Sequence, residues 1–461
     1  MPPSRLLALT LATGLLAGCA TYQPKDLAPA ATQAQLERRS LKDEGLQRFL
    51  STHGASSNQE WDLARLTLAA FYFSPELDLA RAQLAETEAG VRTAGARPNP
   101  SLNFTPGYNQ DATGGVTPWI LGYALDIPVE LAGKRTHRTA EARQQADAAR
   151  LNLASAAWSV RSAVRRTLTE LHAAEETAAL WRDQKPLLAQ AVQLVQLQVQ
   201  AGEVSSFEAS QTRLALNRAE LAARESERAV TLARSRLAES LGLPLSALAE
   251  VRPSYSALAA PSDPLPLAEA RRWAAQNRAD LLAALAVYAA SQSALQGEIA
   301  RQYPDLAIGP GYQLDQGEGK WSLSLNLTLP IFHQNQGPIA AAQARRESAA
   351  AKFLMLQNRV LAEVDRATSA YTSALGDLDT VKTMRTTLEQ QAKTIRAQRA
   401  AGETSRLDLT RAQLELAENA RAELDAHIRA ENALTAFEDA VQRPLAWPES
   451  AWRTAARPTS P

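Results

Sequence analysis

An internal duplication is the feature of this 461-residue chain that most restricts how it can fold. Three short segments recur in one order: Pro100–Tyr108 as Pro304–Tyr312, Leu125–Val129 as Leu327–Ile331, and Ala201–Ser205 as Ala401–Ser405. Their offsets of 204, 202 and 200 positions are nearly constant. A period near 200 is too long for a solenoid unit, which spans about 20–50 residues. The chain therefore contains two copies of a whole structural module.

Each module contains two segments with the period-two alternation of a β-strand. The alternating apolar residues are Leu121, Tyr123, Leu125 and Ile127 in the first module and Leu323, Leu325, Leu327 and Leu329 in the second. A preceding strand is expected over about 100–109 and again over 304–313, with turns at 111–115 and 315–319. Lengths near ten residues suit tilted transmembrane strands, although a soluble sheet with one wet face would alternate in the same way.

The remainder of each module is predicted to be helical. Residues 136–200 contain no glycine and one proline, Pro186, and residues 338–400 contain one glycine, Gly376. At 1.5 Å per residue each helix would be almost 100 Å long. Pro186 is expected to kink the first helix, because it removes a backbone donor. Each helix ends at an Ala-Gly-Glu sequence, in which the glycine can adopt the left-handed cap.

Shorter helices are expected to complete two antiparallel rods. Second arms follow each long helix at about 205–241 and 405–442, and a helix leads into each first strand at about 75–97 and 280–303. The two short helices of a module together match the length of its long helix. We therefore expect them to stack end to end along it, with short helices at 61–72 and 267–277 beside the rods.

The first residues predict export and lipid anchoring. Arg5 precedes the apolar run 6–16, and small residues lead to Cys19, the single cysteine of the chain. A charged start, a short apolar run and small residues before a cleavage site form a secretory signal, and Cys19 stands where a bacterial lipobox places the acylated residue. Ala20 differs from the inner-membrane retention signal, so the outer membrane is the expected destination. Residues 1–18 are predicted to be the signal peptide, and residues 19–57 an acylated tether without regular structure.

The expected domain order follows from these segments. Residues 58–242 and 267–443 form the two repeats, a proline-rich linker occupies 243–266, and 444–461 form the C-terminal tail.

The chain has 49 basic and 49 acidic residues, so its charge suggests no nucleic-acid partner. No stretch beyond the signal is long and apolar enough for a membrane helix, so a membrane-spanning part would consist of strands. Four strands cannot close a barrel, because about eight are needed. Two or three copies would supply them.

The duplicated order of helix, two strands, long helix, Gly-Glu turn and helix over about 60–442 resembles the TolC-like outer-membrane efflux proteins. The resemblance implies a mainly α fold with a small β part. Long helical hairpins would form a periplasmic tunnel, and four strands per chain would contribute to a trimeric 12-stranded transmembrane β-barrel. It also implies an inner-membrane pump and a periplasmic adaptor as partners. The adaptor would dock on the helical tips, which here contain Gly202, Glu203, Gly402 and Glu403.

Within that family, residues 128–135, Pro-Val-Glu-Leu-Ala-Gly-Lys-Arg, look like the heavy-metal-efflux branch. The second module departs from this pattern at 330–337. The expectation that the cargo is a metal cation therefore rests on one segment. Drug or organic-solute efflux and type I protein secretion share the architecture. A periplasmic structural lipoprotein without a pore is a further alternative, which the amphipathic strands disfavour.

No residues suggest catalysis, a cofactor or a resident metal. The five histidines lie far apart in sequence and have no cysteine partner, so no enzyme activity and no metal site are expected. In the family, an acidic residue matching Asp408 forms a ring at the periplasmic entrance, whereas the second acidic position is Arg411 here. We therefore expect Asp408, joined by Glu208, to set cation preference. The alternative is that both carboxylates complement a helix dipole, since each lies in a first turn.

Overall fold

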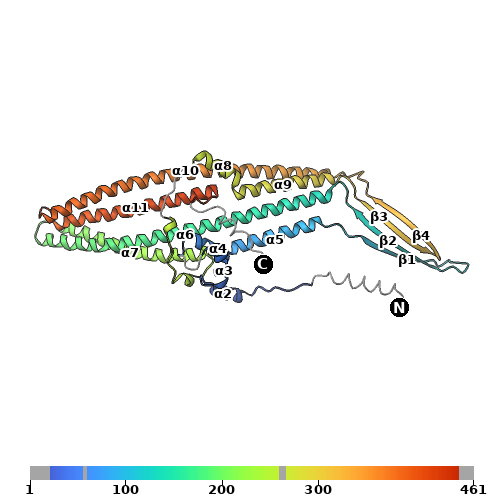
Figure 1. Ribbon diagram of the computed structural model, residues 1–461, viewed down its shortest axis with the longest axis horizontal. Helices are drawn as coiled ribbons and strands as arrows, with labels where there is room; N and C mark the ends of the chain where they lie inside the picture. Colours follow the sequence, from blue (N-terminus) through green and yellow to red (C-terminus); the bar gives the residue numbers. More distant parts are fainter. Residues whose placement is uncertain (1–20, 56–59, 259–265, 446–461) are drawn as a thin grey trace.

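The computed structural model describes residues 21–55, 60–258 and 266–445 of the chain. Figure 1 shows an elongated molecule in which long helices run side by side and four strands extend from one end. The predicted signal peptide over 1–18 and the predicted lipid site at Cys19 lie outside the described residues, as does nearly all of the tail over 444–461.

Two long helices form the axis of the molecule, and the predicted fold class is confirmed. Helix α6 spans Lys134–Gln200 and α10 spans Gln336–Ala400, 67 and 65 residues. Each begins two residues earlier than expected. The preceding residues, Gly133 and Asn335, have φ of 71° and 61°, so a left-handed residue turns the chain from the strands into each helix.

The shorter helices pack along the long ones as the duplication predicts. In the first repeat, α5 (Pro75–Gly95) and α7 (Ser206–Ser240) both pack on α6. In the second, α9 (Ala279–Ala300) and α11 (Arg406–Val441) both pack on α10. Helices α9 and α11 also pack on α6, which places α6 at the centre of the molecule and joins the two repeats along its length.

The largest apolar core surrounds a short helix at the waist of the rods. Helix α4 (Leu63–Phe73) is buried on nearly every side between α3 (Glu44–Thr52) and α6, and α8 (Leu267–Asn277) packs against α10. The 3-10 turns Leu245–Leu248 and Ser256–Leu258 also enter this core, each through a buried leucine. The proline-rich segment is therefore partly packed on the first repeat.

The expectation of an irregular segment at the start of the mature chain is wrong over 29–52. Helices α2 (Pro29–Glu37) and α3 (Glu44–Thr52) form there. The side chain of Asp43 accepts a hydrogen bond from the Leu46 backbone N–H and caps α3. Leu46 and Leu50, one helical turn apart, are buried in the waist core, so tertiary packing stabilises a helix too short to persist alone.

Strands β1 (Ser101–Tyr108), β2 (Trp119–Val129), β3 (Leu306–Asp315) and β4 (Glu318–Leu327) form one antiparallel sheet in the order β1-β2-β3-β4. The two repeats meet at the β2–β3 pair. The second hairpin is tighter than expected, because its turn consists of Gln316 and Gly317 with φ of 53° and 96°. Positive φ at both central residues suits a two-residue hairpin, so β4 begins at 318, within the turn predicted over 315–319.

The register separates the sheet into an apolar and a polar face. Phe104, Tyr123, Tyr312 and Trp321 lie in one cross-strand row on the first face. Their neighbours on the second face, Asn103, Ala124, Gly311 and Ser322, form a small and polar row. The predicted alternation is thus confirmed. Within the described part of the chain, no helix is long and apolar enough to cross a membrane.

Candidate functional site

The two helical tips lie at the end of the molecule opposite the sheet (Figure 1). Both long helices end in the same double hydrogen bond. The Gly202 N–H donates to Val199 O at 3.0 Å and the Glu203 N–H to Gln198 O at 2.9 Å. Gly402 and Glu403 repeat these bonds at 3.1 and 2.9 Å. Gly202 and Gly402 have φ of 74° and 81°, the left-handed conformation that glycine accepts without strain. The predicted caps are confirmed, and all four residues are exposed.

Each of the two helices that follow the tips begins at a serine N-cap, and the second cap contains more hydrogen bonds than the first. Ser205 Oγ accepts from the Glu208 N–H at 3.4 Å. Ser405 Oγ accepts from the Asp408 N–H at 3.1 Å, and the Asp408 carboxylate in turn accepts from the Ser405 N–H at 3.0 Å and its hydroxyl at 2.7 Å. These hydrogen bonds hold the pKa of Asp408 below its usual value. Asp408 is therefore an exposed, ionised carboxylate at a helix N-terminus.

An ion pair joins the two tips. Arg411 Nη2 donates to Glu208 Oε1 at 2.8 Å, and both side chains are about half exposed. The two predicted entrance residues Glu208 and Arg411 thus come together, whereas Asp408 makes its contacts with Ser405. Because Arg411 compensates the charge of Glu208, Asp408 is the one of these two carboxylates that has no basic hydrogen-bond partner in the described structure.

A small apolar cluster lies behind the ion pair. Ala191 and Val195 of α6 are buried against Leu407 of α11, and partly buried residues surround them: Leu194, Val204, Ala209 and Leu414. Leu407 follows Gly402 by five residues and Val195 precedes Gly202 by seven, so the two turns lie at nearly one level. The tips of a single chain therefore form one surface.

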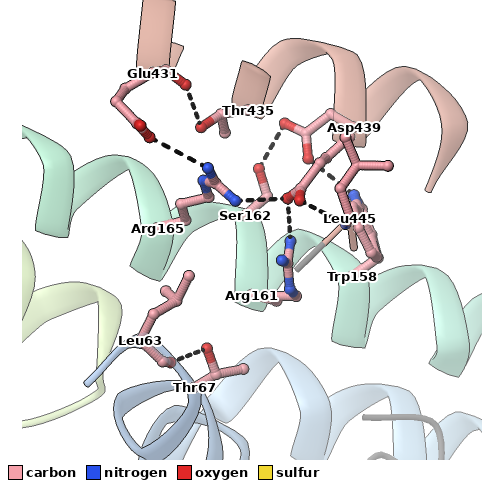
Figure 2. A network of polar contacts seen from close by, with 11 residues as sticks. Leu63, Thr67, Trp158, Arg161, Ser162, Arg165, Glu431, Thr435, Asp439 and Leu445 are labelled. Carbon is pink, nitrogen blue, oxygen red and sulfur yellow. Dashed lines mark hydrogen bonds and ion pairs between the residues drawn. The ribbon is translucent and has the colours of Figure 1, made fainter. Parts of the chain in front are cut away.

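A buried ionic network at the waist was not anticipated from the sequence. Figure 2 shows Arg165 of α6 directed toward Glu431 of α11, with Arg161 one turn away. Arg165 donates to Glu431 at 3.3 Å and to Glu438 at 2.8 Å, and Arg161 donates to the same Glu438 oxygen at 3.0 Å. All four side chains are at most 3% exposed. The two arginines are four residues apart and the two glutamates seven, so each pair lies on one face of its helix. This spacing is the sequence signal from which the network could have been predicted.

Further polar contacts complete this network. Trp158 Nε1 and Ser162 Oγ donate to the two oxygens of Asp439 at 2.9 and 2.6 Å, and the Leu445 N–H donates to Glu438 at 2.8 Å. Burial raises the pKa of Glu431 to about 7, although Arg165 favours its charged form. Burial also raises the pKa of Asp439, against the effect of its two donors. The network fastens α6 of the first repeat to α11 of the second.

A polar groove of about 600 Å³ lies beside the network, between α6, α10 and α11. Its floor includes Arg278, which donates to Asp280 at 2.7 Å, to Glu363 at 3.1 Å and to the Ala440 carbonyl at 2.9 Å. All of these partners belong to the second repeat, so the charge of Arg278 is compensated within that repeat. Among the described residues, no cluster of three or more histidine, cysteine or acidic side chains could hold a metal ion.

Comparisons with known proteins agree with this architecture. The sequence model of the family described as outer membrane efflux protein matches residues 70–243 and 270–441, which are the two repeats. The cobalt-zinc-cadmium resistance protein CzcC of Cupriavidus metallidurans is 28% identical over 280 residues, which cover 60% of this chain and 65% of that protein. The match thus spans less than two thirds of the relative's length.

Solved structures share the fold at low sequence identity. The structure of CusC described for its folding and transmembrane channel formation has a TM-score of 0.66 at 16% identity, covering 84% of this chain and 95% of that one. The outer membrane protein VceC of Vibrio cholerae has a TM-score of 0.66 at 19% identity, covering 82% and 95%. At this level the likeness establishes the fold alone.

Proposed function

This chain belongs to the outer membrane efflux protein family, and on that premise we propose that it is the exit channel of a tripartite efflux system. It passively conducts substrate that an inner-membrane pump delivers through a periplasmic adaptor. Members of the family are channels and not enzymes. The observation that carries the proposal is the polarity of the molecule: both hairpin tips form one surface at one end, and a sheet with a complete apolar face occupies the other.

The sheet and the tips are assigned to the two ends of a duct. Strands β1 and β4 are the unpaired edges of the sheet, and three copies joined through them would form a 12-stranded barrel in the outer membrane. The apolar row through Phe104 and Trp321 would then face lipid. At the other end, Gly202, Glu203, Gly402 and Glu403 are the exposed residues that an adaptor would contact. A detergent-resistant trimer that conducts ions in planar bilayers is the expected result. A stable protein without conductance would favour a structural lipoprotein.

Heavy-metal cations are the proposed cargo. The CzcC relative carries a cobalt-zinc-cadmium resistance name, and the Glu-Leu-Ala-Gly-Lys-Arg segment over 130–135 supports the same branch. In this segment Glu130 binds Arg138 at 2.7 Å and Lys134 binds Asp305 at 2.8 Å, so it fastens the start of α6 to the strands.

The cargo is tested by deleting the gene and measuring growth on graded cobalt, zinc and cadmium, with complementation by the wild-type gene. We expect lower tolerance to at least one of these cations. The matched control is growth on organic antibiotics and dyes. Unchanged metal tolerance with lower tolerance of organic compounds would contradict the metal proposal and favour drug efflux. Unchanged tolerance of both would favour protein secretion.

We assign cation preference at the entrance to a ring of Asp408 side chains, one from each copy. The carboxylate is exposed and its pKa is held low by Ser405, so it stays ionised at neutral pH. Glu208 contributes less, because it is paired with Arg411. Asp408→Asn should lower cation selectivity and block by multivalent cations in single-channel recordings. Glu227→Gln, an exposed change farther along α7, is the control. Equal selectivity of the two variants would exclude the ring.

The lipid anchor at Cys19 remains a proposal from the sequence. Cys19→Ser should abolish incorporation of a palmitate analogue and reduce recovery in outer-membrane fractions. An exposed tether is supported by residues 21–37, which have no buried side chain and precede the packed helix α3. Labelling that persisted in the serine variant would refute acylation at this cysteine.

A further inference from the structure

Two arginines occupy equivalent positions in the two repeats. Arg166 lies on α6, 36 residues before Gly202, and Arg366 lies on α10, 36 residues before Gly402. Both helices run from the sheet to the tips (Figure 1). At 1.5 Å per residue, each arginine is about 54 Å from its turn. Because the two turns lie at nearly one level, the two arginines also lie at nearly one level of the molecule.

Both arginines lie on the side of their helix that is turned away from the apolar cores of the waist. Val164 is fully buried in the core around α4, and Val364 is fully buried in the cluster that α8 forms with α10. Each arginine follows its valine by two residues, which corresponds to a rotation of about 200° around a helix with 3.6 residues per turn. In agreement with this placement, Arg166 and Arg366 are exposed.

The two arginines line one groove, the polar groove of about 600 Å³ beside the buried ionic network. Its walls are α6 and α10, and α11 packs on both of them and forms the floor. Ser155 and Ser159 line the α6 wall and precede Arg166 by eleven and seven residues, so all three lie on one face of the helix. Within the described part of the chain, neither serine hydroxyl forms a hydrogen bond.

The carboxylates of the groove have other partners. Arg278 donates to Asp280 at 2.7 Å and to Glu363 at 3.1 Å. Asp439 accepts hydrogen bonds from two donors of α6, an indole and a hydroxyl. Across the described ranges of the chain, neither Arg166 nor its counterpart on α10 forms an ion pair or a hydrogen bond with these carboxylates or with any other group. Two permanent positive charges therefore remain uncompensated by direct contact, one on each wall.

The groups left without partners are donors. A guanidinium has five N–H donors and no acceptor, and it stays charged at every physiological pH. Its planar fork matches two oxygens of a phosphate or carboxylate group, and such charge-assisted hydrogen bonds are about twice as strong as neutral ones. A ligand that contacts both walls of the groove therefore has to supply several oxygen acceptors and negative charge.

We propose that this groove binds a small oxyanion of the class of inorganic phosphate between Arg166 and Arg366. Ser155 and Ser159 supply further donors from the α6 wall. The bound anion compensates the two guanidinium charges and connects α6 of the first repeat to α10 of the second, which do not pack on each other directly. Every residue of the site comes from one chain, so binding does not require a second copy.

The consequence for transport rests on the proposed function. Helices α4 and α8 cover the opposite side of the rods and would fill a duct placed there, so in the proposed channel the groove faces the interior. Three copies around an axis then bring six arginines to one level, deeper in the duct than Asp408. This ring would oppose the passage of a divalent cation, and bound oxyanions remove that barrier by compensating its charge.

Equilibrium dialysis of the full-length, detergent-purified protein against radiolabelled phosphate tests the site. We expect saturable binding of one phosphate per chain, with competition by sulfate and none by chloride at equal ionic strength. Arg166→Gln and Arg366→Gln should each weaken the affinity about tenfold, and the double variant should weaken it further. The matched control is Arg228→Gln, which removes an exposed arginine of α7 that lies outside the groove. An unchanged midpoint of thermal unfolding shows that each variant is folded.

The outcomes separate the site from the proposed channel. Absence of saturable phosphate binding, or equal affinities of the double variant and Arg228→Gln, would overturn the site even if the protein conducts ions. Binding that depends on both arginines in a protein without conductance would support the site and contradict the channel.

Planar-bilayer recordings test the position of the site in the duct. Phosphate should change the cation selectivity of the wild-type channel and of Arg228→Gln. It should have no effect on the Arg166→Gln, Arg366→Gln double variant, in which the basic ring is absent. A selectivity that responds to phosphate equally in all three proteins would overturn the placement of the groove in the duct.

Discussion

The waist and the tips join the same two repeats by ion pairs, but in opposite environments. At the waist, Arg161 and Arg165 meet Glu431 and Glu438 with almost no exposure, whereas the Glu208–Arg411 pair at the tips is about half exposed. A buried pair cannot be separated without leaving a desolvated charge, while an exposed pair can exchange its partner for water. The repeats are therefore fixed to each other at the waist and weakly fastened at the tips.

The largest effect is expected from opening the waist. Arg165→Met leaves Glu431 without a basic partner in a dry environment, while Glu438 keeps Arg161 at 3.0 Å. Breaking a buried pair in this way costs about 3–5 kcal/mol, which should appear as a much lower midpoint of thermal unfolding in detergent. Arg236→Met is the control, because Arg236 pairs with Glu170 on the surface at 3.2 Å and its loss should be nearly silent. Similar midpoints for the two variants would contradict the distinction between buried and exposed pairs.

The free energy of unfolding should depend on pH through Glu431 at the waist. The pKa of Glu431 is raised from 4.5 to about 7, so the folded chain holds this proton more tightly than the unfolded chain. The free energy of unfolding should therefore fall as the pH rises from about 4.5 to 7, and stay low above 7. One pKa unit corresponds to about 1.4 kcal/mol, so a change of about 1–3 kcal/mol is expected. Glu431→Gln should remove this part of the pH dependence, and an unchanged profile would refute it.

A smaller effect is expected from the backbone of the tips. Gly402→Ala forces an L residue into the left-handed conformation at a φ of 81°, which costs about 1–2 kcal/mol. Gly90→Ala, within α5 and with open space around its Cα, should instead stabilise the protein by about 0.5–1 kcal/mol. Opposite shifts of the unfolding midpoint are the expected measurement. A neutral Gly402→Ala would show that the turn relaxes to another conformation.

The smallest effect is expected from the ion pair between the tips. A double-mutant cycle with Glu208→Gln and Arg411→Gln should give a coupling energy of about 0.2–1 kcal/mol, because solvent screens the pair. The coupling should also decline as salt is raised. A coupling energy as large as that of the buried pairs at the waist would contradict the proposed difference between the two sites.

The element order and the tips could be predicted because their signals are local. The left-handed glycines at 202 and 402 and the serine caps at 205 and 405 end and start helices through contacts within a few residues. The alternation predicted over 322–329 likewise assigned the sheet face correctly as far as Leu327, where β4 ends. The start of β4 was misplaced, because a two-residue turn at Gln316 and Gly317 has no strong sequence signal in a run of glycine and polar residues.

Contacts between distant segments could not be predicted in the same way. Glu208 and Arg411 are 203 residues apart, and Arg161 and Glu438 are 277 apart. Helix α3 at 44–52 is stabilised because Leu46 and Leu50 are buried in the core around α4, and a helix of nine residues would not persist in isolation. In each case the partner is determined by how separate segments of the chain pack together, which no single segment encodes.

The sequence by itself determined that two modules exist, where their helices end and which strand faces are apolar, because periodicity and capping depend on neighbouring residues. The tertiary structure decided that α6 lies between the repeats. It also decided that Arg411 compensates the charge of Glu208, while Asp408 forms its hydrogen bonds with Ser405. It also decided which edges of the chain stay open. These are consequences of packing, since burial and charge pairing depend on which surfaces the folded chain brings together.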